Sequence, residues 1–285
     1  MKRGGFVRIL LCCIGMLLLC GCAELPEQDA PQGIPADSSE VPALVADMLL
    51  QTEESMQLRF SDAAEFDPEA VIYDAVAQHV LARTMLRSVL WSRSGNALTI
   101  TAQYAKPADQ LRKDKEMLAE SVTAWCGNYD AESDDVFVLL AHDALCRRCA
   151  YSEISPDRHS AYGAWIGKQA VCDGYAEAFA LLMETAGIPV KIVTGSAQDG
   201  DSPSEPHAWN LVQLAGAWYH IDCTWDDAGD SVSHTYFLCD DTAISATHTW
   251  DAKKYPPALG GGYRYEQIVS DMMAKVRTGG CEDIG

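Results

Sequence analysis

The sequence predicts an α+β domain in which one helix packs on an antiparallel sheet, preceded by a small α/β region. An apolar stripe at helical spacing runs through residues 172–186, and Gly187 follows it at the position where helices commonly end. Residues 190–194 have the composition of a strand. Residues 207–214 and 218–225 flank a short Ala-Gly segment, which is typical of a β-hairpin.

The composition is that of an acidic globular protein. The 285 residues carry a formal net charge of −20, and 48% of them are hydrophobic, enough for a sizeable core. Such a surface repels nucleic acid and anionic membranes, so we expect neither as a direct partner. Cationic substrates, cell-wall polymers and simple solubility are all compatible with this charge.

The first 21 residues have the pattern of a signal peptide. Three basic residues precede an apolar run of about 12 residues, which is shorter than the roughly 20 that a membrane-spanning helix needs. The next residues, Leu-Cys-Gly-Cys22, resemble the bacterial lipobox, so we expect lipidation at Cys22; cleavage without lipid is the alternative. Residues 22–42 are rich in Pro and acidic residues and predict a disordered tether. We therefore expect an exported chain, lipid-anchored to the outer face of a bacterial cell membrane.

Residues 43–107 predict the small α/β region. Strands are expected at residues 56–60 and 98–104, the second of which alternates clearly, and residues 68–91 are expected to be mainly helical. The segment contains no group of residues that suggests chemistry. Its expected role is packing or contact with a partner.

Residues 108–285 form the main predicted domain. Two helical segments, at residues 110–125 and 134–149, precede a loop that contains Pro156 and His159. The hairpin and the helix that begins at Cys172 follow this loop.

Eleven cysteines are many for a soluble chain. Beyond the signal segment, Cys22 and Cys172, an even number is left, which is compatible with disulfides in an exported protein, although their pairing cannot be deduced from sequence. These are Cys126, Cys146, Cys149, Cys223, Cys239 and Cys281. Cys146 and Cys149 have C-x-x-C spacing, but no second pair accompanies them, so we interpret both as semi-buried helix positions.

Cys172 is the candidate nucleophile because it opens a predicted helix. The positive end of the helix dipole stabilises a thiolate and so suits a reactive thiol. A cysteine at a helix start is more often structural, so this position needs partners to indicate catalysis.

The predicted hairpin supplies those partners. With its turn at residues 215–216, His207 lies opposite Thr224, and Trp209 lies opposite Asp222. His207 and Asp222 are then diagonal neighbours on one face, close enough for their side chains to meet. The spacing places a carboxylate beside an imidazole.

Acyl transfer by a thiol requires a base that accepts the thiol proton and a carboxylate that orients the base. His207 would take the proton of Cys172, while Asp222 would fix the imidazole tautomer and stabilise the imidazolium. The developing oxyanion needs donors, for which the backbone N–H of Cys172 is one candidate and the side chain of Gln169 or Tyr162 a second.

Three sequence blocks carry a resemblance to a known family. AVCDGYAEAFALLMETAGIPVKIVTG, HAWNLV and WYHIDCTWDD resemble the transglutaminase-like superfamily, whose core is related to papain-like cysteine peptidases, and they occur in the family's order. The resemblance covers residues 137–257, including later fragments around His234 and His248. It implies a papain-like fold and a triad of Cys172, His207 and Asp222. We expect that the reaction needs no cofactor or metal.

Several alternatives to this triad are open. His220 shares the face of Asp222 and is an alternative base, although the H-A-W-N block favours His207. Asp226 and Asp227 are alternative carboxylates for orienting the catalytic histidine. The acidic runs at residues 199–201 and 226–230 lack the ligand spacing of a calcium loop and are better interpreted as solvated turns.

Cys223 follows Asp222 on the opposite strand face, so it is expected to be buried or disulfide-bonded.

The expected activity is thiol-dependent acyl transfer at peptide or amide bonds, on a peptide, protein or cell-wall peptide substrate. Hydrolysis is slightly favoured over cross-linking because water outside the cell competes strongly with amines. A second class is a surface lipoprotein that binds such material without turnover, its Cys172 tied in a disulfide. A redox role for Cys146 and Cys149 is a third. The sequence predicts no oligomeric state.

Overall fold

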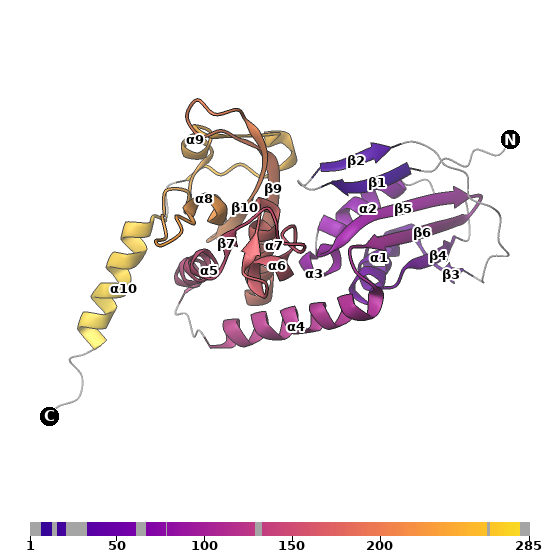
Figure 1. Cartoon of the computed structure of the whole chain (residues 1–285), viewed down its shortest axis with the longest axis horizontal. Helices are drawn as coiled ribbons and strands as arrows, with labels where there is room; N and C mark the ends of the chain where they lie inside the picture. The colour runs from indigo at the N-terminus through magenta and orange to yellow at the C-terminus, as the bar shows by residue number, and fades with distance from the viewer. Residues whose placement is uncertain are drawn as a thin grey trace. The chain divides into compact units, whose positions relative to one another are not determined.

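The computed structural model describes residues 7–12, 16–20, 33–60, 67–77, 79–128, 133–260 and 263–279. It divides into two compact units, Met1–Glu120 and Ser121–Gly285 (Figure 1). Helix α4 (Ala108–Gly127) runs without interruption across this boundary. The predicted boundaries after residues 21, 42 and 107 stay predictions.

The first unit is an α/β unit built on a six-stranded sheet with the order β2-β1-β5-β6-β4-β3. Its strands are β1 (Val7–Cys12), β2 (Met16–Cys20), β3 (Ile34–Pro35), β4 (Ser55–Arg59), β5 (Leu86–Ser94) and β6 (Ala97–Tyr104). Its helices are η1 (Ser38–Glu40), α1 (Val41–Leu50), α2 (Pro68–Ala77) and α3 (Val80–Arg83). Apolar side chains of α1, α2 and the strands form one buried cluster, which explains the alternation seen in β4 and β6.

Strands β1 and β2 lie in the segment with the pattern of a signal peptide. They pair antiparallel with each other, and β1 also pairs with β5. The signal peptide stays a prediction, and the expected lipidation site Cys22 lies outside the described residues.

The helix expected over residues 68–91 is wrong in its last third. The chain leaves the helical region at Met85, whose φ is 62°, and residues from Leu86 form β5, which pairs with β6 along its length. The turn between the two strands places Gly95 at a φ of 60°. The β5–β6 hairpin therefore pairs the backbone N–H and C=O groups that a helix would have paired within itself. Pairing between the strands outweighs the helical preference of this segment.

The second unit combines helices with a four-stranded antiparallel sheet of order β11-β10-β9-β12. Its sheet strands are β9 (Val190–Ala197), β10 (Glu205–Leu214), β11 (Ala217–Ile221) and β12 (His248–Trp250), and a parallel pair is formed by β7 (Ala150–Tyr151) and β8 (Gln169–Ala170). Its helices are α5 (Asp134–Arg148), α6 (Ala161–Trp165), α7 (Cys172–Ala186), α8 (Cys223–Asp226), α9 (Asp241–Ile244), η2 (Ala252–Lys254) and α10 (Tyr265–Gly279). The predicted α+β class is confirmed.

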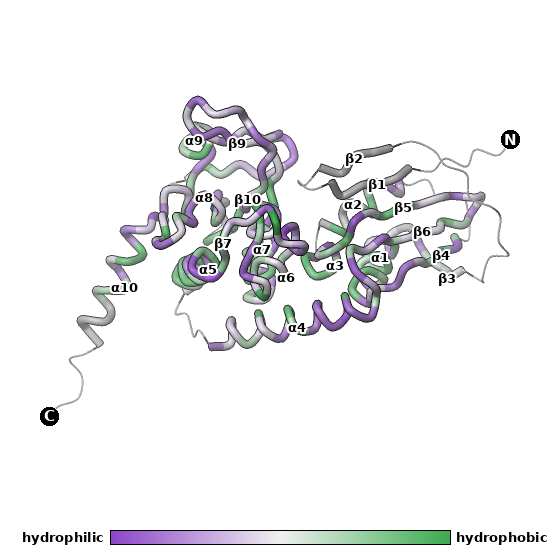
Figure 2. The backbone as a smooth tube through the Cα atoms, in the orientation of Figure 1, coloured by the Kyte–Doolittle hydropathy of each residue, from purple (hydrophilic) through white to green (hydrophobic). Residues whose placement is uncertain are grey.

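Helix α7 is the centre of this unit. Its first twelve residues are all buried, and it packs on β9, β10, α5 and α6. Gly187 ends it at a φ of 75°, and the next N–H, of Ile188, donates to the carbonyl of Met183, as predicted from the glycine. Figure 2 shows hydrophobic residues along α5 and α7, and hydrophilic ones in the first half of α4.

The β10–β11 hairpin has the predicted register. Leu214 pairs with Ala217 and Asn210 with Ile221, around a turn in which both Ala215 and Gly216 have positive φ. The second strand is shorter than expected, however, because it ends at Ile221. Asp222 then caps α8 by accepting the N–H groups of Thr224 and Trp225, so the cap starts a helix where a strand was predicted.

Among the described residues, no helix has both the length and the apolar character needed to cross a membrane.

Candidate active site

Cys172 is the first residue of α7 and a free thiol, 7% exposed. Helix geometry provides no acceptor for the N–H groups of the first turn, and that of Cys172 is one of them. The thiol therefore sits at the positive end of the helix dipole, beside a backbone donor of the kind that stabilises an oxyanion.

Gly174 explains part of the Cys-Asp-Gly spacing. A Cβ atom at this position would lie 2.5 Å from the carbonyl oxygen of Arg158 and 2.8 Å from Cβ of Ala170. A side chain there would push the 158–160 loop away from the first turn of α7. Glycine is therefore needed for close packing around Cys172.

Asn210 fixes β10 against α7. Its side-chain amide donates to the carbonyl of Ala176 at 3.0 Å, and the residue is only 1% exposed. Ala176 lies one turn after Cys172, and Asn210 lies three residues after His207. This hydrogen bond helps to hold His207 in position relative to the thiol, and it gives a structural reason for the H-x-W-N spacing.

His207 lies between the thiol and a carboxylate. Its Nε2 bonds Oδ2 of Asp222 at 2.7 Å, and Cys172 lies close enough to its ring to affect the pKa of His207. Burial disfavours the imidazolium, but the charge and hydrogen bond of Asp222, together with Cys172, outweigh it and raise the pKa of His207 to about 10. The ring stacks on Trp209 with centroids 6.0 Å apart, which restricts its orientation. The structure thus brings the three predicted triad residues together.

Asp222 is a completely buried carboxylate whose two oxygens have separate tasks. Oδ1 accepts the N–H groups of Thr224 and Trp225, and Oδ2 accepts from two imidazoles, His207 at 2.7 Å and His248 at 3.0 Å. Burial opposes its ionisation, but His207 and these hydrogen bonds hold the pKa of Asp222 well below its usual range. The carboxylate is therefore fixed in place and charged.

His248, at the start of β12, is a site residue that the sequence analysis did not assign. With Nε2 donating to Asp222, its Nδ1 accepts the hydroxyl of Thr247 at 2.8 Å, so a neutral ring satisfies both nitrogens. The fragment around His248 belongs to the family resemblance, but no sequence spacing relates it to Asp222. Pairing of β12 with β9 brings it there.

We expect His248→Ala to lower kcat about 10- to 100-fold, the equivalent of losing one charge-assisted hydrogen bond, with KM little changed. His248→Gln, whose amide can still donate to Asp222, should recover much of the loss. Steady-state kinetics of both variants measure this, with His220→Gln as a matched control for a buried imidazole that does not touch Asp222. Equal losses in His248→Ala and His248→Gln would contradict a positioning role.

The alternative residues have other partners. His220 accepts the indole N–H of Trp209 at 2.9 Å and bonds Asp241 at 2.9 Å, and burial lowers its pKa. Asp226 faces His142 at 3.3 Å, and Asp227 accepts the hydroxyl of Tyr175 at 2.5 Å. None of these contacts involves Cys172, so the geometry favours His207 and Asp222.

The two predicted oxyanion donors stay predictions. Gln169 is exposed in β8, and Tyr162 is half-buried in α6. Tyr151, in β7, is a residue near Cys172 that the sequence analysis did not single out. It is 55% exposed, and the pKa of its hydroxyl is raised by partial burial and by the negative charge of Cys172 and nearby acids. It is a candidate contact for substrate.

His207, Asp222 and His248 form one of the groups whose donor atoms lie close enough to hold a metal. Their 2.7 and 3.0 Å separations are those of hydrogen bonds, and Asp222 is already satisfied by four donors. Hydrogen bonding accounts for this group fully.

A thiol, an imidazole and a carboxylate that converge from α7, β10 and the end of β11 are the groups of a thiol-dependent acyl-transfer enzyme. Residues 116–223 match the family described as the transglutaminase-like superfamily. The matched segment includes Cys172, His207 and Asp222, and this part of the chain resembles the transglutaminase-like superfamily.

Individual relatives match smaller parts. Kyphoscoliosis peptidase of Mus musculus and that of Homo sapiens are each 41% identical over 61 residues, which cover 19% of this chain and 9% of the relative. The TGase in one crystal structure has 12% sequence identity to this chain. The match covers 79% of this chain and 64% of the TGase chain, with a TM-score of 0.36. The periplasmic domain of TgpA from Pseudomonas aeruginosa is 17% identical over 52% of this chain and 65% of its own, with a TM-score of 0.32.

Proposed function

We propose that this protein is a thiol-dependent acyl-transfer enzyme that acts on peptide or amide bonds, with Cys172 as nucleophile, His207 as base and Asp222 as orienter. The observation that carries the proposal is the 2.7 Å hydrogen bond between the buried Asp222 and His207, beside the free thiol of Cys172 at a helix N-terminus. The name of the mouse and human relatives, a peptidase, agrees with it.

The reaction follows from the positions of these groups. The thiolate of Cys172 attacks the carbonyl carbon of the scissile bond while His207 holds the proton that the thiol has lost. The oxyanion is stabilised by the N–H of Cys172 at the start of α7. His207 then gives its proton to the departing amine, which leaves a thioester on Cys172. Water, or a second amine, resolves the thioester and returns the thiol.

Hydrolysis is the proposed outcome. Peptide substrates, a protein glutamine donor with a lysine acceptor, and cell-wall peptides should be compared by mass spectrometry of the products. Hydrolysed peptide supports the proposal, whereas stable isopeptide products with little hydrolysis would show a cross-linking enzyme instead.

A non-catalytic binding protein is the second candidate. Cys172 is a free thiol, which favours the enzyme over a site closed by a disulfide. Iodoacetamide labelling of the native protein, followed by intact-mass analysis, separates the two. An alkylation rate at Cys172 no faster than that of an ordinary thiol, with or without reductant, would favour the binding protein.

The pH dependence of the reaction should report the raised pKa of His207. The imidazolium is present below its pKa and lost above it, so we expect the alkaline limb of kcat/KM near pH 10 instead of near the ordinary imidazole value of about 6.5. The profile is measured from about pH 6 to about pH 11 with a neutral peptide substrate. An alkaline limb near pH 7 would show that Asp222 does not hold the proton on His207.

The same two groups affect folding stability, so circular dichroism must accompany the profile. The raised pKa of His207 contributes stability that is complete below about pH 6.5 and is lost as the pH rises towards 10. The lowered pKa of Asp222 contributes stability that is present above about pH 4 and is lost on acidification.

We further propose export and lipid anchoring through Cys22, with contact to the membrane through the lipid alone. The lipobox-like sequence supports this, and the acidic composition argues against direct binding to an anionic bilayer. Mass spectrometry of the N-terminal peptide tests it, and an unmodified Cys22 would contradict it.

A further inference from the structure

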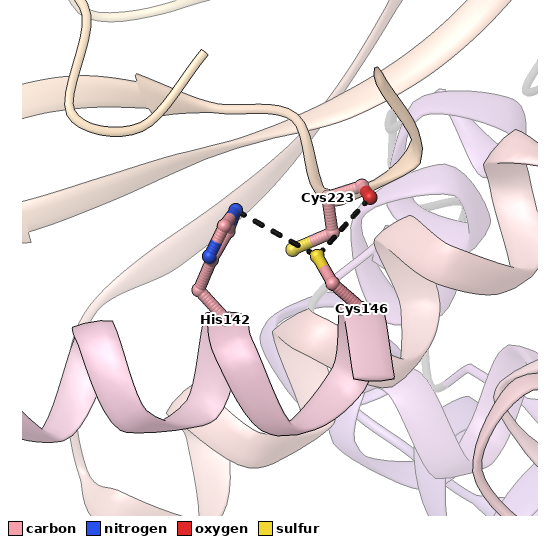
Figure 3. A group of neighbouring side chains, drawn as sticks. All are labelled: His142, Cys146 and Cys223. Carbon is pink, nitrogen blue, oxygen red and sulfur yellow. Dashed lines mark hydrogen bonds between the residues drawn. The ribbon is translucent and has the colours of Figure 1, made fainter. Parts of the chain in front are cut away.

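A second cluster of chemically active side chains lies in the Ser121–Gly285 unit. His142 and Cys146 are four residues apart on α5 and so share a face, and Cys223 opens α8. One nitrogen and the two sulfurs of these residues lie within 4.8 Å of one another, and all three residues are buried. Figure 3 shows both sulfur atoms close together on the side that faces the imidazole.

The spacing of these atoms suits a tetrahedral metal ion. Sγ of Cys146 lies 3.7 Å from Nε2 of His142. In a tetrahedral zinc site with Zn–S of about 2.3 Å and Zn–N of about 2.0–2.1 Å, a sulfur and a nitrogen ligand are separated by roughly 3.6 Å. Cys146 and His142 thus stand at nearly the ligand-to-ligand distance without rearrangement.

Asp226 adjoins the imidazole side of the cluster, but its carboxylate is not among the ligand atoms that lie within 4.8 Å of one another. Its Oδ2 lies 3.3 Å from Nε2 of His142, close to the roughly 3.4 Å between nitrogen and oxygen ligands of a tetrahedral zinc ion. Asp226 is completely buried, and its oxygens are oriented by the N–H of Tyr236 at 3.1 Å. It comes from α8, three residues after Cys223.

The surroundings of His142 fit a metal ligand. Its other nitrogen, Nδ1, lies 3.2 Å from Oδ1 of Asp143, which directs the Nδ1 proton to that carboxylate and the Nε2 lone pair into the cluster. Asp143 is itself held by Arg147 and His234, each at 2.7 Å. Carboxylates of this kind commonly orient histidine ligands.

We propose that His142, Cys146 and Cys223 form a structural site for a divalent cation of the zinc type, with the carboxylate of Asp226 turning towards the ion as the fourth ligand. Two thiolates and an imidazole select a borderline-soft ion over magnesium or calcium, and buried Cys and His ligands of this kind are typical of structural zinc sites. The site does not rest on the proposed acyl-transfer function, because no step proposed for that reaction involves these residues. It would join α5 to α8, the helix that Asp222 caps.

The test starts from the full chain purified under reducing conditions, without chelators or metal-affinity resin, incubated with zinc and desalted. We expect about one equivalent of zinc per chain by elemental mass spectrometry. Cys146→Ser should retain little zinc, whereas Cys239→Ser, which removes a half-buried thiol outside the cluster, should retain it all. Cobalt in place of zinc should give thiolate charge-transfer and tetrahedral visible bands in the wild-type protein, a readout that does not depend on a variant folding.

Three results would overturn the proposal. The first is reduced wild-type protein that retains no zinc, and the second is equal zinc in wild type and Cys146→Ser. The third is a cobalt spectrum without thiolate bands. If no metal binds, peptide mapping without reductant shows which other arrangement satisfies the cluster: a Cys146–Cys223 disulfide, or free thiols beside a His142 imidazolium paired with Asp226 and Asp143.

Discussion

Replacing Cys172 with alanine is expected to lower acyl-transfer activity by at least about 10⁴-fold, because no thioester can form without the sulfur. The residue is buried and small, so loss of one sulfur atom should leave the fold and the His207–Asp222 hydrogen bond in place. Turnover of a peptide substrate and intact-mass labelling with iodoacetamide measure the effect on the same sample.

The control for Cys172→Ala is Cys126→Ala, which removes a half-buried thiol whose sulfur donates to the carbonyl of Leu182. It should retain full activity and the fast-reacting thiol. If Cys172→Ala keeps measurable turnover and Cys126→Ala loses it, Cys172 is not the nucleophile.

Asp222→Asn is expected to lower kcat by about 10³- to 10⁴-fold. The two oxygens of Asp222 accept from four donors, so an amide group cannot replace them. In one orientation the NH₂ of the new amide group faces the N–H groups of His207 and His248, so that donors oppose donors. In the other orientation the NH₂ faces the backbone N–H groups that begin α8, with the same result. The neutral side chain also removes the charge that raises the pKa of His207.

Two measurements distinguish this loss from simple unfolding. The alkaline limb of kcat/KM should move from near pH 10 towards the ordinary imidazole range, a shift that a destabilised but otherwise normal site would not show. Asp241→Asn is the matched control, since Asp241 bonds the buried His220 at 2.9 Å in a second Asp–His pair away from Cys172. Comparable kcat losses in both variants would contradict a specific role for Asp222.

The predicted triad depends on local patterns that tertiary structure could not easily alter. The end of α7 at Gly187 and the turn at residues 215–216 are set by backbone conformations that few sequences adopt. Once the turn is fixed, the period of a strand places His207 and Asp222 on one face. This is why the predicted register and the 2.7 Å hydrogen bond agree.

The errors lie where local patterns allow two structures. Residues 86–91 are apolar enough for either a helix or a strand, and pairing with β6 selects the strand. Residues 223–226 continue the alternation of β11, but the carboxylate of Asp222 can cap a helix, and the capped turn forms instead.

The sequence by itself determined the α+β class, the helix that starts at Cys172, and the His207–Asp222 hairpin, because each follows from contacts within a short stretch of chain. Only the tertiary structure decided that His248 shares Asp222 with His207, and that Cys146 and Cys223 lie beside His142. These residues are separated by 26 and 77 positions in the sequence. Packing of β12 on β9 and of α8 on α5 brings them together, and such distant contacts leave no periodic pattern in a single sequence.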